Sequence, residues 1–165
     1  MHADSREALR RLYQFRCGYC GTSEVDVGAA LTVDHFQPRA RGGADDPVNW
    51  VYCCPACNAF KGDYWNPDSP YRLLHPLHDD LVLFITEEAD GRLRGLTETG
   101  IFHVQRLHLN RPQLVAQRLA RRIHAEIRQA LATSRQEEAA RLQRLAALEE
   151  ELRVALHRLE QMRRR

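Results

Sequence analysis

The chain has 165 residues, of which 44% are hydrophobic and 28% are charged, with a formal net charge of +2. These proportions are typical of a soluble globular protein with one ordinary domain, or with a small domain and an appendage, and they exclude wholesale disorder. No apolar run approaches the length of a membrane span, and the first residues lack the apolar core of a signal peptide. We therefore expect a cytoplasmic protein.

The net charge is unevenly distributed along the chain. Met1 to Ile101 contains 10 basic and 15 acidic residues, whereas Phe102 to Arg165 contains 14 basic and 7 acidic residues. The second part is therefore the basic one.

The first predicted element is a helix from Ser5 to Arg16, because its start has the spacing of a capping box and its apolar residues fall on one face. A tight turn follows at residues 17–21, where two glycines accompany a cysteine pair. Polar and small residues predict a loop over 22–30, and Leu31 to Phe36 is typical of a short strand.

The next residues predict a loop, a second strand and a helix. The loop from Pro38 to Pro47 contains a Gly-Gly pair, Trp50 to Tyr52 suits a strand, and Pro55 begins a helix that runs to Lys61. Strand, loop, strand and helix together make a ββα unit. A proline-rich connection leads to a β-hairpin, with strands at Leu81 to Thr86 and Arg92 to Leu96, which we expect to extend the small sheet.

From Ile101 onward the pattern is helical, with Asn110 as the expected N-cap. Apolar residues recur every four positions, and further on they alternate steps of three and four as in a heptad seam. The two sets are Val115, Leu119, Ile123, Ile127 and Leu131, then Leu145, Leu148, Leu152, Ala155, Leu159 and Met162. Ser134 and Glu137 have capping-box spacing, which suits an interruption of the helix. Fewer than three full heptads is a weak coiled-coil signal, so two helices packed as a hairpin are favoured. One long helix that binds a partner is the alternative.

Five cysteines in a cytoplasmic chain favour metal binding over disulfides. Cys17 and Cys20 form one Cys-x-x-Cys pair, and Cys54 and Cys57 form another. Four thiolates suit tetrahedral zinc in a closed structural site. Cys53 competes with Cys54 for a place in this set, and Cys54 is preferred because only it has the two-residue spacing to Cys57. We therefore predict a structural Zn²⁺.

The stretch around these cysteines resembles the HNH endonuclease family, over roughly Phe15 to Asp63. The residues that carry the resemblance are Asp34-His35, Pro38, Gly42-Gly43, Asn49, Cys54-x2-Cys57-Asn58 and Lys61-Gly62. Zinc-stapled members of the family share these elements in the same order and spacing. The resemblance implies an α+β fold, with a ββα-metal core stapled by four cysteines, and hydrolysis of phosphodiester bonds in DNA. The expected domains are a nuclease domain over 1–102 and a basic helical region over 103–165.

Each expected site residue has a role in that reaction. His35 suits a general base because imidazole titrates near neutral pH. Asp34, on the other face of the strand, and Asn58, on the helix, offer hard oxygen ligands for a catalytic Mg²⁺ or Mn²⁺. By resemblance, Asn49 braces the loop and orients His35, and Lys61 lies one helical turn after Asn58, in reach of a phosphate.

One position departs from the family pattern. Members with a third metal-binding His carry it four residues after the second ligand, and Gly62 occupies that place here. Only two protein ligands for the catalytic cation can therefore be named, unless Asp63 turns in as a third.

The basic helices have two interpretations. Several arginines, among them Arg118, Arg121, Arg122, Arg128, Arg135 and Arg163 to Arg165, suit neutralisation of nucleic-acid phosphates. The alternative is the solvated face of an amphipathic helix.

The sequence thus predicts a cytoplasmic, metal-dependent HNH endonuclease that acts on DNA. The expected setting is bacterial restriction, phage defence or a mobile element, with the chain acting alone or as the effector subunit of a complex. Its C-terminal helices offer a surface for a protein partner or for homo-oligomers. The competing hypothesis is a zinc-stapled nucleic-acid-binding or adaptor module without effective catalysis.

Overall fold

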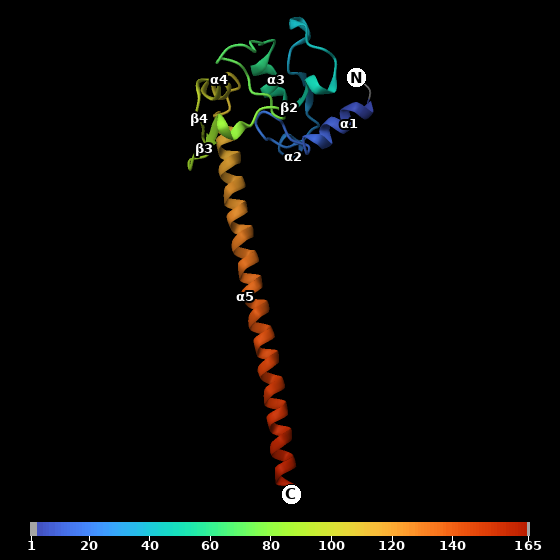
Figure 1. Ribbon diagram of the computed structural model, residues 1–165, viewed down its shortest axis with the longest axis vertical. Helices are drawn as coiled ribbons and strands as arrows, with labels where there is room; N and C mark the ends of the chain where they lie inside the picture. Colours follow the sequence, from blue (N-terminus) through green and yellow to red (C-terminus); the bar gives the residue numbers. More distant parts are fainter. Residues whose placement is uncertain (1–2, 165) are drawn as a thin grey trace. The chain divides into compact units, whose positions relative to one another are not determined.

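The structure is a computed structural model that describes residues 3–164 (Figure 1). It divides into two compact units, Met1–Leu119 and Ala120–Arg165. The elements are α1 Ala3–Leu12, α2 Glu24–Val27, β1 Thr32–His35, η1 Arg39–Arg41, η2 Pro47–Asn49, β2 Trp50–Cys53, α3 Pro55–Lys61, η3 Leu81–Leu83, β3 Ile85–Glu87, β4 Leu93–Gly95, α4 Glu98–Arg106 and α5 Pro112–Arg163. The α+β class is confirmed. The predicted boundary between residues 102 and 103 falls inside α4.

The centre of the first unit is the predicted ββα arrangement of β1, β2 and α3. The strands pair antiparallel, with Asp34 opposite Val51 and His35 opposite Trp50. All four residues of β2 are buried, so β2 lies within the core. Helix α3 starts as predicted, because Cys54 serves as its N-cap and Pro55 supplies a preset φ in the first turn.

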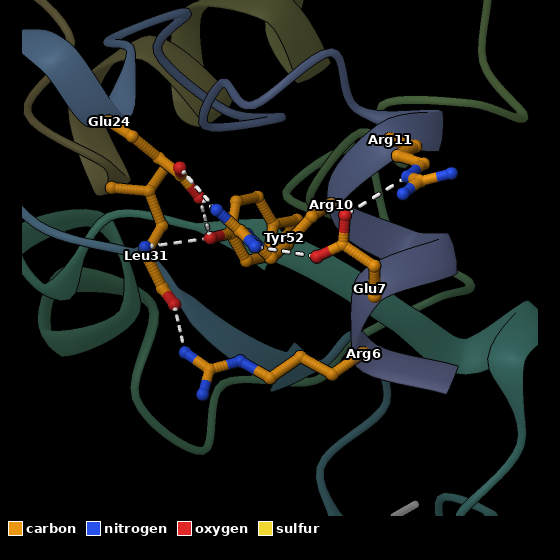
Figure 2. Close-up of polar contacts among 7 residues, drawn as sticks. All are labelled: Arg6, Glu7, Arg10, Arg11, Glu24, Leu31 and Tyr52. Carbon is orange, nitrogen blue, oxygen red and sulfur yellow. Dashed lines mark hydrogen bonds and ion pairs between the residues drawn. The ribbon is translucent and has the colours of Figure 1, made fainter. Parts of the chain in front are cut away.

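A polar network attaches the N-terminal helix to β2 (Figure 2). The Tyr52 hydroxyl donates to Glu24 and accepts from the Leu31 amide at 2.8 Å, while Arg10 pairs with Glu24 at 2.7 Å. The Arg6 guanidinium donates to the Leu31 carbonyl at 2.8 Å. Hydrogen bonds from Arg10 lower the pKa of Glu24 to about 2, so its carboxylate is charged at neutral pH. These contacts hold α1, α2 and β2 together.

Two N-terminal expectations need correction. Helix α1 ends at Leu12 rather than Arg16, because Gln14 and Phe15 adopt positive φ angles of 51° and 59°. The predicted loop over residues 22–30 contains the short helix α2 instead. Ser23 and Asp26 form a capping box there, a signal present in the sequence.

The hairpin of β3 and β4 forms a separate sheet and does not extend the β1–β2 sheet, so that prediction is wrong. The backbone amide of Gly18 donates to the Tyr52 carbonyl at 2.8 Å, which takes a hydrogen-bonding position on β2. The hairpin instead packs on α4, where a Cβ at Gly100 would lie 1.9 Å from the Phe84 carbonyl oxygen. Leu81–Leu83 is a 3-10 turn rather than the start of the strand.

The helical region also differs from the prediction at its start. Thr97 caps α4, and the helix ends after Arg106, with His108 at a φ of 48°. The Asn110 side chain accepts from the Leu93 amide at 2.7 Å and donates to its carbonyl at 2.8 Å. It therefore lies against β4 as a strand neighbour would, and its expected N-cap role is wrong.

Helix α5 continues without a break from Pro112 to Arg163 (Figure 1). The expected hairpin does not form, since the chain has no glycine or proline after Pro112 and Thr133 donates its hydroxyl to the Gln129 carbonyl at 3.1 Å within the helix. Leu114 and Arg118 are the residues of this helix that are buried among those described. No helix within residues 3–164 is both long and apolar enough to cross a membrane.

Candidate functional site

Four cysteines from two turns converge on one point. The sulfurs of Cys17, Cys20, Cys54 and Cys57 lie within 4.8 Å of one another, and those of Cys20 and Cys54 are 3.7 Å apart. Tetrahedral zinc with Zn–S bonds of about 2.3 Å requires sulfur–sulfur separations of about 3.8 Å. The donor set therefore fits Zn²⁺. Cys53 is buried and lies outside the cluster, so the preference for Cys54 is confirmed.

The local backbone explains how each pair forms a knuckle. Gly21 takes a φ of 76° and donates its amide to the Cys17 carbonyl, which folds the first pair back on itself. In the second pair, the Cys54 sulfur accepts from the Cys57 amide at 3.4 Å as the cap of α3. The Arg111 guanidinium lies 3.7 Å from the Cys57 sulfur. It can balance part of the negative charge that four thiolates bring.

The second feature is a His-Asp pair at the end of β1. The Nε2 atom of His35 lies 2.8 Å from Oδ1 of Asp45, and the indole of Trp50 donates to the same oxygen at 3.0 Å. Hydrogen bonds from His35 and Trp50 lower the pKa of Asp45, so it is a carboxylate at neutral pH. Because a carboxylate only accepts, the proton of a neutral His35 ring belongs on Nε2. The Nδ1 atom then carries the lone pair.

Asn49 fastens the loop that carries Asp45. Its side-chain oxygen accepts from the Gln37 amide at 2.8 Å, and its nitrogen donates to the carbonyls of Gln37 and Ala44 at 3.0 and 2.9 Å. A Cβ on Gly43 would lie 1.8 Å from the Gln37 carbonyl oxygen, so only glycine fits where the loop closes. Asn49 thus joins the two ends of the loop directly beside Asp45.

Asp34 points into the protein, where it forms a buried ion pair. Its Oδ1 accepts from the Lys61 ammonium at 3.0 Å and its Oδ2 from the Tyr19 hydroxyl at 2.8 Å. The Lys61 side chain is fully buried and also donates to the His35 carbonyl at 2.8 Å. Burial raises the pKa of Asp34, and the Lys61 charge and both hydrogen bonds oppose that rise.

Asn58 lies half-buried on α3, and its backbone carbonyl accepts from the Gly62 amide at 2.9 Å where the helix ends. Among residues 3–164, the side-chain hydrogen bonds of Asp34 go to Tyr19 and Lys61 and none goes to Asn58. The structure therefore brings together Asp34 with Lys61 and His35 with Asp45.

Comparison with known families gives one match. Residues 17–63 match the model of the HNH endonuclease family. This segment of the chain is similar to an HNH endonuclease domain. The matched segment begins at the first cysteine of the cluster and ends after α3. No curated protein and no solved structure matches the chain.

The HNH match and the cysteine geometry confirm the family and the four-cysteine type of fold predicted from the sequence. In the described part of the chain, the cysteine cluster is the one group of three or more His, Cys, Asp or Glu residues whose ligand atoms converge. The cysteine cluster therefore supports one bound metal. It does not bear on a catalytic cation.

Sequence reasoning missed three residues that shape the HNH site. Asp45 orients His35, Tyr19 holds Asp34, and Arg111 lies beside the cysteine sulfurs. Asp45 was visible as a carboxylate four residues before Asn49, in a loop that must fold back on β1. Arg111 carried no such signal, because 54 residues separate it from Cys57 and only the fold brings them together.

Proposed function

We propose that the chain is an endonuclease that hydrolyses phosphodiester bonds in DNA, with His35 as its general base. The observation that carries the proposal is the hydrogen bond between His35 Nε2 and Asp45 Oδ1 at 2.8 Å. It leaves Nδ1 as the basic nitrogen on a ring that is partly open to solvent.

In the proposed reaction, Nδ1 of His35 takes a proton from the attacking water. Asp45 keeps the ring in the required tautomer and stabilises the imidazolium that forms. Asn49 acts indirectly, because it holds the loop that carries Asp45. Neither Asp45 nor Asn49 has to touch the substrate for this role.

The phosphate needs positive partners, and Lys61 does not supply one in this arrangement because its ammonium is fully buried. We propose instead that Lys61 fixes Asp34 and the end of β1. Arg39 and Arg41 are exposed in the same loop as Asp45, and they suit phosphate contacts. In the C-terminal helix, Arg118 donates to the carbonyls of Gly91 and Leu109 and is buried, so it does not belong to an exposed basic face.

A catalytic Mg²⁺ or Mn²⁺ would take Asp34 and Asn58 as its protein ligands. With both oxygens of Asp34 hydrogen-bonded and the side chain nearly buried, this donor set is closed to a cation as it stands. These residues do not fit a divalent cation while the Lys61 ammonium occupies Oδ1. When bound, such a cation neutralises charge on the phosphate and the leaving oxygen.

The test is cleavage of plasmid, single-stranded DNA and RNA by the zinc-loaded full chain, with Mg²⁺ or Mn²⁺. His35→Ala is expected to abolish cleavage, and His157→Ala, at an exposed position of α5, is the matched control and should keep it. Unchanged cleavage by His35→Ala would refute the assignment of the base. Activity on RNA alone would refute the assignment of DNA.

A second candidate is a zinc-stapled nucleic-acid-binding or adaptor module without effective catalysis. The closed Asp34–Lys61 pair favours it, because that pair removes a cation ligand. The two candidates differ in one measurement. DNA binding that persists in His35→Ala and Asn58→Ala, with no cleavage by the unaltered chain in any divalent metal, supports the adaptor.

The cellular setting that we propose is bacterial restriction, phage defence or a mobile element, with the chain as the effector subunit of a complex. It rests on the family alone. Light scattering and cleavage assays with and without the products of neighbouring genes test it, and full activity of the chain without other proteins contradicts the effector role.

A further inference from the structure

The second unit presents an apolar seam that nothing in it covers. Every residue from Ile123 to Arg164 is exposed, including the leucines of the heptad pattern. Ile127, Leu131, Leu145, Leu148, Leu152 and Leu159 are 49–61% exposed. A single helix in water gains little stability from propensity alone, and most helices depend on packing of their apolar face. This seam therefore calls for an occupant.

We propose that the occupant is a second copy of the same helix, paired antiparallel over Ala120–Leu159. The steps of three and four place Leu145, Leu152 and Leu159 at position a of the heptad and Leu148 and Ala155 at position d. In an antiparallel pair, position a of one helix faces position d of the other. Positions e and g flank the seam. In the antiparallel pair, position e faces position e of the second copy, and position g faces position g.

One antiparallel register matches every charged pair along the seam. With its centre between Ala139 and Ala140, it puts Glu138 (a) opposite Arg141 (d) of the second copy. Beside the seam, it puts Glu137 opposite Arg144 (both g) and Arg128 opposite Glu149 (both e). Two-fold symmetry makes each pair twice. No like charges face each other at these positions.

The same register also joins the apolar positions. It stacks Leu131 on Leu148 and Ile127 on Leu152, and it puts Leu159 beside Ala120 and Leu145 beside Ser134 of the second copy. Two pairs of large aliphatic residues thus pack in the seam, and the two remaining leucines lie beside small residues.

The parallel arrangement fits the sequence less well. In register, it sets position a against a and d against d, so Glu138 would face its own copy and Arg141 would do the same. Two buried like-charge pairs would then lie in the middle of the seam. An unrelated partner would leave the self-complementary charge order without a reason.

The experiment measures the oligomeric state of the zinc-loaded full chain by light scattering and sedimentation equilibrium. The unaltered chain is expected to form a dimer. Glu137→Arg and Arg144→Glu should each weaken the dimer roughly 4- to 30-fold, because each turns two attractive pairs into repulsive ones. The double variant E137R/R144E should restore it.

Restoration reports a contact between two copies, since residues seven apart on one helix lie about 10 Å apart along its axis and do not touch. In a parallel dimer Arg144 would face Glu149 instead, so the double variant would stay weak. The control is Q136R/Q143E, which adds the same charges on the opposite face and should leave the dimer unchanged. Equal helicity by circular dichroism shows that each variant is folded.

Three outcomes overturn the proposal. They are a monomeric chain at its highest soluble concentration, single variants that dimerise as tightly as the unaltered chain, and a double variant that stays weak. A monomer that becomes helically paired only with another protein would assign the seam to that protein.

Discussion

Replacement of Lys61 by methionine tests the buried ion pair that underlies the HNH site. Methionine keeps most of the length of the side chain and removes its charge. Asp34 would then stay buried with the Tyr19 hydroxyl as its remaining side-chain partner. The backbone carbonyl of His35 would lose the ammonium that it accepts from at 2.8 Å.

The expected cost follows from the burial of both partners. Removal of one member of a buried pair typically costs 3–5 kcal/mol, since the other charge is left without compensation. The remaining hydrogen bond from Tyr19 places Lys61→Met near the lower end, at about 3 kcal/mol. The pKa of Asp34, already raised by burial, should rise further without Lys61. A carboxyl whose pKa is higher in the folded state destabilises the fold as pH rises above its unfolded value, so the loss should be larger at pH 8 than at pH 5.

The assay is a double-mutant cycle by urea unfolding, with zinc content matched in all samples. Asp34→Asn leaves Lys61 unpaired and should also destabilise, whereas the double variant D34N/K61M carries no buried charge and should lose less than the sum of the two. A Lys61→Met protein within about 0.5 kcal/mol of the unaltered chain, the range of ordinary surface substitutions, would refute the buried pair.

The remaining predictions concern the orientation of the base, the zinc and the pH dependence. Asp45→Ala should lower kcat of DNA cleavage roughly 10- to 100-fold with little change in KM, and Asp45→Asn, which still accepts from the ring, should lose less; an unchanged kcat contradicts the orienting role. Cys17→Ser should lose zinc and cleavage together, as measured by metal analysis and plasmid assay, and a folded, active variant refutes that link. Burial lowers the pKa of His103 to about 4, below its unfolded value of about 6.5, so stability is expected to fall as pH drops between these values, by about 3 kcal/mol for this residue. His103→Gln can keep the acceptor for the Leu74 amide, and its urea midpoint should depend less on pH; equal slopes contradict the assignment.

The ββα core could be predicted from the sequence because each of its signals is local. Pro55 and the cap at Cys54 set the start of α3, and the spacing of each cysteine pair fixed the knuckles. The helix of residues 24–27 was missed although Ser23 and Asp26 spell its capping box, since the surrounding residues are small and polar. The place of the β-hairpin depends on which edge of the sheet is free, and only the fold determines that.

The site was harder to predict because residue type does not show which partner a side chain will choose. Asp34 and Lys61 were both identified, as a cation ligand and a phosphate contact, and the structure pairs them with each other. Asn110 is an equally good helix cap and strand neighbour in sequence terms, and in the fold its side chain bonds both the amide and the carbonyl of Leu93. The continuous α5 depends on the absence of a breaking residue, which outweighed the capping-box spacing of Ser134 and Glu137.

Helix α3 connects the cysteine cluster to the proposed base through one chain of contacts. Cys54 and Cys57 fix where the helix begins. At its other end, the Lys61 ammonium donates to Asp34 and to the carbonyl of His35. Loss of zinc should therefore release the Asp34 pair and the end of β1, and so lower stability and cleavage together. Asp45 holds the same His35 ring from an exposed loop, so its loss should lower cleavage alone. This difference separates the two supports of His35 by experiment.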